Sequence, residues 1–406
     1  MPNILFATPF FNALATQFIQ ALGNLPAVRL GVISQEPQEL LPPEVRRGIT
    51  AHWRIDNALD TAQLTWAAES LANQMGPVQR LLAVNEQIQV PAAEVRERMG
   101  IEGTMPEVAI NFRDKPRMKD ILRAAGVPCA RHQLATTEQE VWDFAGRVGF
   151  PVVVKPPAGA ASQATFRAGS SEELRHALEQ IPPRPGQPIL LEEFITGEEY
   201  SFDTFSIHGK AAWHSWTKYL PTPLEVMQSP WIQWRVLLPR EVDDPEIDAI
   251  RPVAVRALEA LGMESGLSHL EWFRRPDGSV AVSEVGMRPP GAQITTLMSR
   301  AHDFDCVEAW ARLMVFGEFE PPVRKFAAGA AYLRGQGQGR VRAVYGLDKI
   351  HQEMGNLISD VKWPDIGQEK SPSYEGEGYI IVRHPETAVV EQALLDIINT
   401  VRVVLE

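Results

Sequence analysis

Cysteine is almost absent from this 406-residue sequence. Only Cys129 and Cys306 occur, far apart and outside any CxxC spacing. They provide neither a disulfide framework nor a thiolate zinc site. This scarcity agrees with a reducing compartment, and we expect a cytoplasmic protein.

A basic leader and a long apolar run are also missing. The first residues read MPNILFATPFF, with no positive charge before a short apolar run. Nowhere do about 18 uncharged apolar residues follow one another, as a membrane helix requires. We therefore expect neither an export signal nor a membrane span.

Positive charge is in deficit. Lysine and arginine number 39 against 51 acidic residues, which gives a formal net charge of −12. A protein of this sign repels a phosphate backbone, so nucleic acid is not an expected partner. The 45% hydrophobic content is ordinary for a globular protein, and 406 residues exceed what one core usually organises. The sequence therefore predicts several domains.

Two common nucleotide-binding motifs do not occur. A strand over residues 4–7 and a helix over residues 12–22 begin an α/β unit, but the turn between them has no GxGxxG. No GxxxxGK[ST] is present either, which excludes a P-loop. We interpret this first unit, ending near residue 105, as a scaffold or acceptor-side domain.

Denser patterns follow from residue 111. Pro116 can start a helix that Gly126 ends, and a buried strand Val152 to Val154 delivers Lys155 to its end. Further along, the sequence predicts a hairpin turning at residues 208–209, a long helix over 244–261 and, after residues 321–322, a last α+β unit.

The most informative feature is a second hairpin around Asp277-Gly278. If these two residues form the loop, Glu271 and Glu284 are directly opposite each other on adjacent antiparallel strands. Their Cβ atoms would then lie about 5 Å apart, where like charges are destabilising unless a cation compensates. Mg²⁺ binds through one or two carboxylates plus substrate phosphates, so the pair predicts a metal site for ATP.

A plainer interpretation of the two glutamates stays open. One can be solvated at the hairpin edge while the other pairs with Arg274, Arg275 or Arg288. Arg288 also favours the functional interpretation, because four residues after Glu284 it can stabilise charge on a transferring phosphoryl group. The small-residue loop after Lys155 is by itself weak evidence for phosphate binding.

Several motifs occur in the order found in ATP-grasp enzymes, and residues 106–318 resemble that family. The matching segments are Asp114-Lys115, Met118-Lys119, Ala125-Gly-Val-Pro128, Pro151-Val-Val-Val-Lys-Pro156, Leu191-Glu-Glu-Phe-Ile195, Gly197-Glu-Glu-Tyr-Ser-Phe-Asp203 and Glu284-x-x-x-Arg288. The end of the chain resembles the C-terminal domain of biotin carboxylase-like members.

The resemblance implies a fold of mixed α/β and α+β class. It comprises an N-terminal Rossmann-like, pre-ATP-grasp domain over 1–105, ATP-grasp subdomains over 106–196 and 197–320, and a small C-terminal α+β domain over 321–406. Related enzymes are often dimers through the first domain, so a homodimer is compatible with the resemblance.

The resemblance also implies roles for individual residues. Lys115, Lys155 and, less directly, Lys218 would hold ATP phosphates, under a loop of Gly159, Ala160, Ala161 and Ser162. Glu192, Glu193, Phe194 and Ile195 would form the hinge that binds adenine, and Glu199 would bind the ribose. Glu271 and Glu284 would ligate Mg²⁺ or Mn²⁺, and Arg288 would steady an acyl phosphate.

Two positions depart from the family pattern. Gly286 stands where most members have asparagine, which removes an oxygen ligand and puts a second metal ion in doubt. Ser162-Gln-Ala164 replaces the Ser-x-Gly of many relatives, which puts the closing motion of that loop in doubt. The Glu-x-Gly-x-Arg form resembles that of some L-amino acid ligases.

The predicted function is an ADP-forming carboxylate-amine ligase acting on small molecules, with an amino acid as the expected carboxylate. One alternative is a carboxylase-type relative that activates bicarbonate. Another is a nucleotide-binding protein without ligase chemistry. Neither the carboxylate nor the amine can be identified from the sequence.

Overall fold

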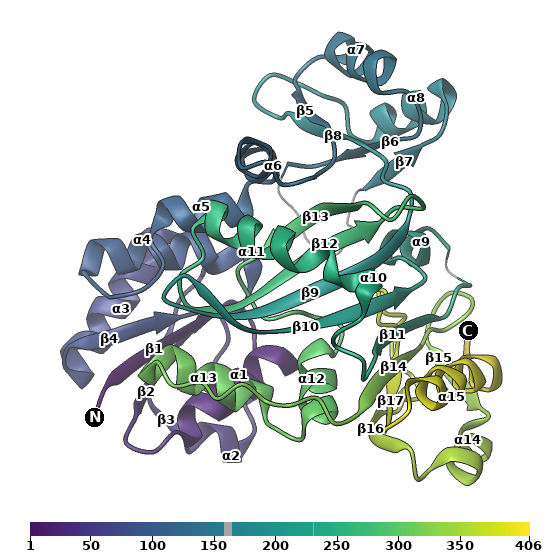
Figure 1. Cartoon of the computed structure of the whole chain (residues 1–406). Coiled ribbons are helices and arrows are strands. Elements are labelled where there is room, and N and C mark those ends of the chain that lie inside the picture. The colour runs from purple at the N-terminus through teal and green to yellow at the C-terminus, as the bar shows by residue number, and fades with distance from the viewer. Residues whose placement is uncertain (158–164, 230) are drawn as a thin grey trace.

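Hydrophobic strands near the N-terminus form a parallel four-stranded sheet in this computed structural model, which describes residues 1–157, 165–229 and 231–406 (Figure 1). The strand order is β3-β2-β1-β4. Ile4 and Phe6 pack into a core with one helix layer, and Leu5 and Ala7 into a second core on the opposite face. This alternation is the period of a strand covered on both faces. The elements are β1 (Asn3–Thr8), α1 (Ala13–Asn24), β2 (Arg29–Ser34), η1 (Gln38–Leu40), α2 (Pro43–Arg46), β3 (Ile49–Arg54), α3 (Thr61–Met75), β4 (Val78–Leu82), η2 (Glu86–Ile88) and α4 (Gln89–Met99).

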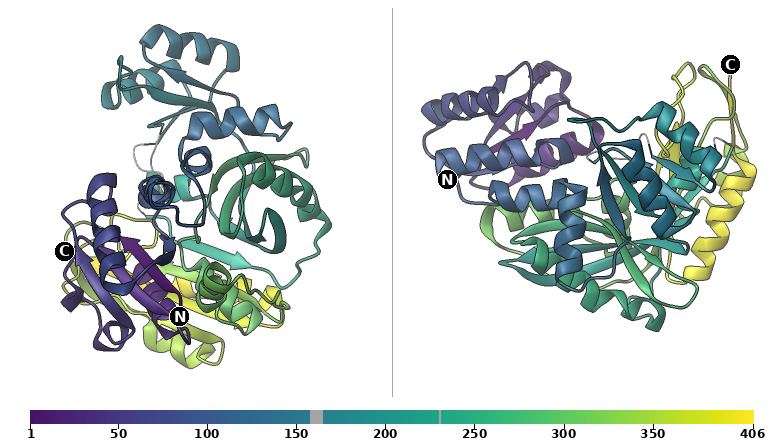
Figure 2. Two further views of the ribbon diagram at one scale, coloured as in Figure 1. Left: turned by 90° about the vertical axis from the view of Figure 1, so that its left-hand side faces the viewer. Right: turned by 90° about the horizontal axis from the view of Figure 1, so that it is seen from above.

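Two helices lead to a small antiparallel sheet of order β5-β8-β6-β7, which projects from the rest of the molecule (Figures 1 and 2). The two helices packed on this sheet, α7 and α8, begin at side-chain caps: Thr137 forms a capping box, and Ser170 accepts from the N–H of Glu173. The elements are α5 (Pro106–Arg113), α6 (Lys115–Ala124), β5 (His132–Ala135), α7 (Glu138–Val148), β6 (Val152–Lys155), β7 (Phe166–Ala168), α8 (Ser171–Gln180) and β8 (Ile189–Glu193).

An eight-stranded antiparallel sheet of order β13-β12-β9-β10-β11-β14-β17-β16 runs through the centre. The strands after residue 321 continue this sheet through the pairing of β11 with β14. The elements are β9 (Glu198–Ile207), β10 (Lys210–Leu220), α9 (Pro223–Gln228), β11 (Trp234–Leu238), α10 (Pro245–Asp248), α11 (Ile250–Leu261), β12 (Gly266–Arg274), β13 (Val280–Gly286), α12 (Ile294–His302), α13 (Cys306–Phe316), β14 (Ala327–Leu333), α14 (Leu347–Met354), β16 (Ile358–Lys362), β17 (Gly378–His384) and α15 (Thr387–Thr400); β15 (Val341–Tyr345) and β18 (Arg402–Leu405) form a separate pair.

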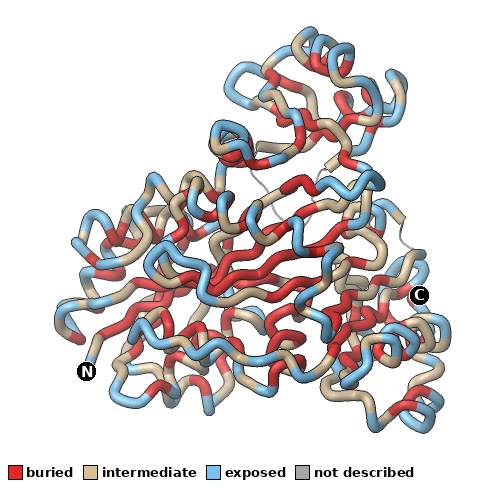
Figure 3. The backbone as a smooth tube through the Cα atoms, in the orientation of Figure 1, coloured by how far each residue is buried: buried red, intermediate tan, exposed pale blue. Residues whose placement is uncertain are grey.

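Helices cover both faces of the large sheet, and the buried segments concentrate in its strands (Figure 3). α11 shares a core with Phe202 and Trp272, whereas α12 and α13 pack with Phe205 and with α1 of the N-terminal unit. The N-terminal unit is therefore joined to the large sheet through one continuous hydrophobic core. Among the described residues, no helix combines the length and the hydropathy that crossing a bilayer requires.

Several local predictions agree with the structure, but one predicted helix does not. Lys155 ends β6, and Gly262 caps α11 with a φ of 85°. The single helix predicted over 244–261 is wrong, because α10 ends at Asp248 and α11 begins at Ile250. Pro252 has no N–H to donate to the carbonyl of Asp248, which explains the interruption.

Candidate active site

A cavity of about 880 Å³ lies between the small sheet, the β12-β13 hairpin and the loops of the N- and C-terminal units. One part, here the lysine end, is lined by Lys115, Lys155, Glu192, Glu271 and Glu284. The other part, the aromatic end, is lined by Glu86, Trp234, Arg288, Ala292 and Tyr374. Its walls therefore come from widely separated segments of the chain.

The β12-β13 hairpin places Glu271 opposite Glu284, as predicted. The predicted two-residue loop is wrong: the Arg275 N–H donates to the Ser279 carbonyl, which leaves Pro276, Asp277 and Gly278 in the loop. Gly278 has a φ of 80°, as a three-residue loop of this kind requires. A bulge then adds one residue on β13, because Glu271 pairs with Glu284 but Trp272 pairs with Val282. The longer loop and the bulge at residue 283 cancel, which restores the predicted pairing.

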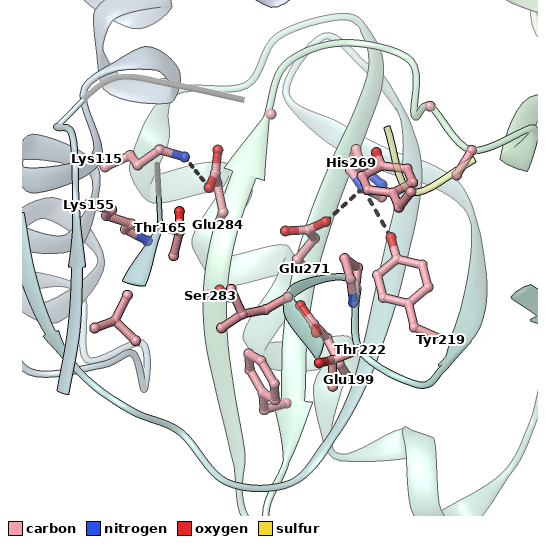
Figure 4. Close-up of a pocket in the computed structure, with 18 of the residues that line it drawn as sticks. Lys115, Lys155, Thr165, Glu199, Tyr219, Thr222, His269, Glu271, Ser283 and Glu284 are labelled. Carbon is pink, nitrogen blue, oxygen red and sulfur yellow. Dashed lines mark hydrogen bonds and ion pairs between the residues drawn. The ribbon is translucent and has the colours of Figure 1, made fainter. Parts of the chain in front are cut away.

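Both carboxylates project to the same side of the hairpin (Figure 4). Lys115 Nζ contacts Glu284 Oε2 directly, and Lys155 is also close enough to act on it electrostatically. Burial alone would raise the pKa of Glu284, but Lys115 and Lys155 lower this pKa to about 2. Glu284 is therefore ionised at neutral pH and neutralised by lysine.

Glu192 at the end of β8 forms a second buried cluster. Its carboxylate lies 3.2 Å from Lys119 Nζ and 2.8 Å from Lys155 Nζ. Burial would raise the pKa of Glu192, but the two lysines lower it to about 2. Lys119 Nζ also donates to the Ser283 carbonyl at 2.8 Å, which gives the carbonyl of the bulged residue a hydrogen-bond partner. Lys119 thus links the small sheet to the hairpin that carries Glu284.

A histidine stands beside Glu271. His269 Nε2 lies 3.6 Å from Glu271 Oε1, and His269 Nδ1 lies 2.6 Å from Asp203 Oδ1. Burial would lower the pKa of His269, but Asp203 and Glu271 raise it to about 9. The second oxygen of Asp203 accepts a hydrogen bond from Ser201 Oγ at 2.8 Å. This buried chain of side chains fixes the orientation of the imidazolium next to Glu271.

The donor set at the lysine end suits a hard divalent cation that brings its own oxygen ligands. Glu271 and Glu284 offer carboxylate oxygens, which Mg²⁺ and Mn²⁺ prefer. Within the described residues, no group of three or more His, Cys, Asp or Glu side chains could hold a metal ion. A cation at this site would therefore need oxygens from a ligand such as a phosphate chain.

The aromatic end is built around Arg288. Glu86, from η2 of the N-terminal unit, lies 3.1 Å from Arg288 Nε and 3.1 Å from Arg113 Nη1. Burial would lower the pKa of Arg288, but Glu86 raises it, so the guanidinium stays charged. Tyr374, from the loop before β17, packs edge-on against Trp234 with ring centroids 4.6 Å apart. Three separate parts of the chain therefore meet at Arg288.

Residues 120–303, which include the small sheet and the hairpin, match the family model of the ATP-grasp domain. The chain contains an ATP-grasp domain.

Relatives and solved structures agree with this ATP-grasp assignment. An L-arginine-specific L-amino acid ligase of Bacillus subtilis is 24% identical over 249 residues, covering 60% of this chain and 59% of the relative. The crystal structure of an L-amino acid ligase from Bacillus licheniformis has a TM-score of 0.80 at 18% identity and covers 100% of this chain and 99% of that one. The structure of N5-carboxyaminoimidazole ribonucleotide synthetase from Thermotoga maritima has a TM-score of 0.73 at 17% identity, with both chains fully covered. These likenesses show the ATP-grasp fold across the whole chain, which confirms the predicted fold class.

Sequence matches to curated relatives are shorter than those relatives. The chain spans about three fifths of the length of the first two, at 60% and 59%.

The other predicted site residues differ in where they lie. Glu193, Phe194, Ile195 and Glu199 line the cavity, and burial and the nearby Glu271 raise the pKa of Glu199 well above its usual range. Lys218 is not one of the residues that line the cavity, and its Nζ lies 2.6 Å from Glu198 Oε1. The predicted phosphate loop, Gly159, Ala160, Ala161 and Ser162, lies outside the described residues.

The plainer interpretation of the hairpin named three arginines as partners of its glutamates. The structure gives each of them another partner: Arg274 lies 3.9 Å from Glu198, Arg275 lies 3.5 Å from Glu193, and Arg288 pairs with Glu86. Glu284 contacts Lys115 instead, so its charge is balanced by a lysine that lines the cavity.

Sequence reasoning did not find Glu86, Lys119 or Tyr374 as parts of this site. Lys119 had a signal, since it is four residues after Lys115 on α6 and the two share one helix face. Glu86 and Tyr374 had none, because their partners lie far along the chain. Only the tertiary fold brings them to Arg288.

Proposed function

We propose that this chain is an ATP-dependent ligase that activates a small carboxylate, an amino acid, as an acyl phosphate and joins it to an amine, with release of ADP and phosphate. The observation that carries the proposal is the pair of opposed carboxylates, Glu271 and Glu284, in one cavity with Lys115, Lys155 and Arg288. Cations placed around two acidic groups suit a polyphosphate that arrives with a divalent metal ion.

Residues of the lysine end would bind ATP. Lys115 and Lys155 neutralise the phosphates, under the loop of residues 159–162. The Glu193 and Phe194 N–H groups donate to the Arg131 and Pro151 carbonyls, and the Glu193 carbonyl and the Ile195 N–H would bind adenine. Glu199, which lines the cavity, would hydrogen-bond the ribose hydroxyls.

Glu271 and Glu284 would hold Mg²⁺ or Mn²⁺, which neutralises phosphate charge when bound. Lys115, which contacts Glu284 in the structure, is then available to the phosphates. The γ-phosphoryl group passes to a carboxylate oxygen of the amino acid, which breaks the bond to the ADP oxygen. Arg288 neutralises the acyl phosphate. The amine nitrogen then forms the C–N bond, phosphate leaves, and the nitrogen loses a proton to solvent. The protein contributes mainly positioning and charge neutralisation.

The test is a screen of ADP release from Mg-ATP by the purified chain with single amino acids, pairs of amino acids and bicarbonate. The expected result is ADP release that requires amino acids and equals phosphate release. Stimulation by bicarbonate alone would favour a carboxylase-type activity, which the fold likeness to the Thermotoga maritima synthetase keeps as the second candidate. Tight ATP binding without turnover under any condition would favour a non-catalytic nucleotide-binding protein.

A further inference from the structure

The segment that follows Arg288 has an unusual backbone. Ala292 and Gln293 have φ values of 52° and 55°, so two consecutive residues with a Cβ adopt the left-handed conformation just before α12. Such a conformation persists only where the surrounding structure holds it, and it concentrates at functional sites. Gly291, Ala292 and Ile294 all line the cavity.

Both polar groups of the Ala292 backbone are held by residues from beyond position 321. The Ala292 N–H donates to Glu375 Oε1 at 3.3 Å, and the Tyr332 hydroxyl donates to the Ala292 carbonyl. The Gln293 side chain also bonds to Glu375 and accepts a hydrogen bond from Thr296 Oγ1 at 3.1 Å. The left-handed turn is thus clamped from the C-terminal part of the chain.

The clamp lies next to the groups that would meet the carboxylate substrate. Tyr374 is adjacent to Glu375 in sequence, lines the cavity and packs against Trp234. Arg288 is four residues before Ala292 and lines the same end. A shift of the Ala292 peptide would therefore move the cavity wall beside Arg288 without touching the lysine end.

We propose that Glu375 is a positioning residue, which together with Tyr332 fixes the two peptide groups that flank Ala292 and thereby the wall of the carboxylate-substrate site. This inference rests on the proposed ligase function for its kinetic consequence. The clamp itself concerns only the backbone at residues 291–294 and does not depend on the ligase activity. Loss of the clamp should therefore weaken binding of the amino acid and leave ATP binding unchanged.

The experiment compares Glu375→Ala, which removes the acceptor, with Glu375→Gln, which keeps an oxygen acceptor in the same place. Tyr332→Phe removes only the hydroxyl that donates to the Ala292 carbonyl, and Glu353→Ala on α14 serves as the surface control. Hydrogen exchange of the amides at 291–294 and the KM values for ATP and for the amino acid are measured on the full chain. Losing one hydrogen bond should speed this exchange and raise the amino acid KM about tenfold.

The expected pattern is a change in Glu375→Ala and Tyr332→Phe, near-normal values in Glu375→Gln and Glu353→Ala, and an unchanged KM for ATP. Unaltered exchange at 291–294 in both Glu375→Ala and Tyr332→Phe would overturn the clamp, as would equal rises in both KM values. If the wild type releases no ADP with any amino acid, the ligase function fails, while the exchange measurement still decides the clamp.

Discussion

The two ends of the cavity are built in different ways. At the lysine end, the charged groups come from α6, from strand ends and from one hairpin, and Glu192 and Glu284 each have a lysine partner at close range. At the aromatic end, Glu86, Arg288 and Tyr374 come from the N-terminal unit, the ATP-grasp domain and the C-terminal unit. The first end is a local construction, and the second exists only when three parts of the chain are assembled.

This difference suggests a division of labour. In our proposal the nucleotide is the ligand that all ATP-grasp enzymes share. The lysine end, which would bind it, is encoded in short sequence motifs. The substrate differs between enzymes, and its half is formed by parts of the chain that can vary independently. Changes at the lysine end should therefore impair the use of ATP with every substrate, whereas changes at the aromatic end should alter the choice of substrate.

The largest effect is expected from Glu284→Gln. It removes a metal ligand and the counter-charge of Lys115, so amino-acid-dependent ADP release should fall about 10³-fold. The change keeps side-chain volume, so the far-UV circular dichroism spectrum should stay that of wild type. Glu259→Gln on the exposed face of α11 is the matched control. Unchanged turnover in Glu284→Gln would remove the lysine end as the catalytic centre.

Acid should act on the lysine end through Glu192. Its pKa is lowered from 4.5 to about 2, so its contribution to stability is fully present above about pH 4.5 and is lost as the pH falls towards 2. Wild type and Glu192→Gln should differ by about 3 kcal/mol in the free energy of unfolding at pH 7, and this gap should close on acidification. Urea unfolding at pH 7, 4 and 3 measures it. A gap of the same size at pH 3 would show that ionisation of Glu192 is not its source.

Two lysines test where the ATP phosphates bind, because the sequence predicted phosphate contacts for both Lys115 and Lys218 and only Lys115 lines the cavity. Lys115→Met should raise the KM for ATP about tenfold, because Lys115 faces the cavity and its charge is lost to the phosphates. Lys218→Met should change this KM by less than about twofold, because Lys218 pairs with Glu198 outside the cavity wall. Initial-rate ATP titrations of both variants measure the contrast. Comparable effects would restore the phosphate-binding role first predicted for Lys218.

The predictable part of the site follows from short-range rules. Strand alternation and a turn signal were enough to pair Glu271 with Glu284, although the loop and the bulge were each missed by one residue and cancelled. Bulges are not encoded by hydrophobic periodicity, because they depend on a partner for the extra residue, here Lys119 for the Ser283 carbonyl. Glu86 and Arg288 are 202 residues apart, and no local pattern announces such a contact.

The fold shows the same limit. Motif order indicated the ATP-grasp domain, and the strand and helix predicted over residues 4–7 and 12–22 indicated the N-terminal α/β unit. The pairing of β11 with β14 joins the C-terminal strands to the central sheet. Composition does not reveal which strand edges pair. The broken helix at Ala249 was predictable from Pro252, since proline removes the hydrogen bond to residue 248.

The smallest and sharpest test concerns Gly286, at the junction of the two ends. The nearest neighbours of a Cβ placed there would be the Arg288 side chain at 3.5 Å and the His269 carbonyl at 3.8 Å, so a side chain can start at this position without a clash at its Cβ. Gly286→Asn should exchange a water ligand for an amide oxygen and lower the Mg²⁺ concentration for half-maximal ADP release by about threefold. Gly286→Ala adds only the Cβ, without an oxygen ligand, and should leave this concentration unchanged. A lower Mg²⁺ requirement in both variants would mean that reduced backbone freedom, and not an added oxygen, controls metal binding; no change in either would place the cation away from β13.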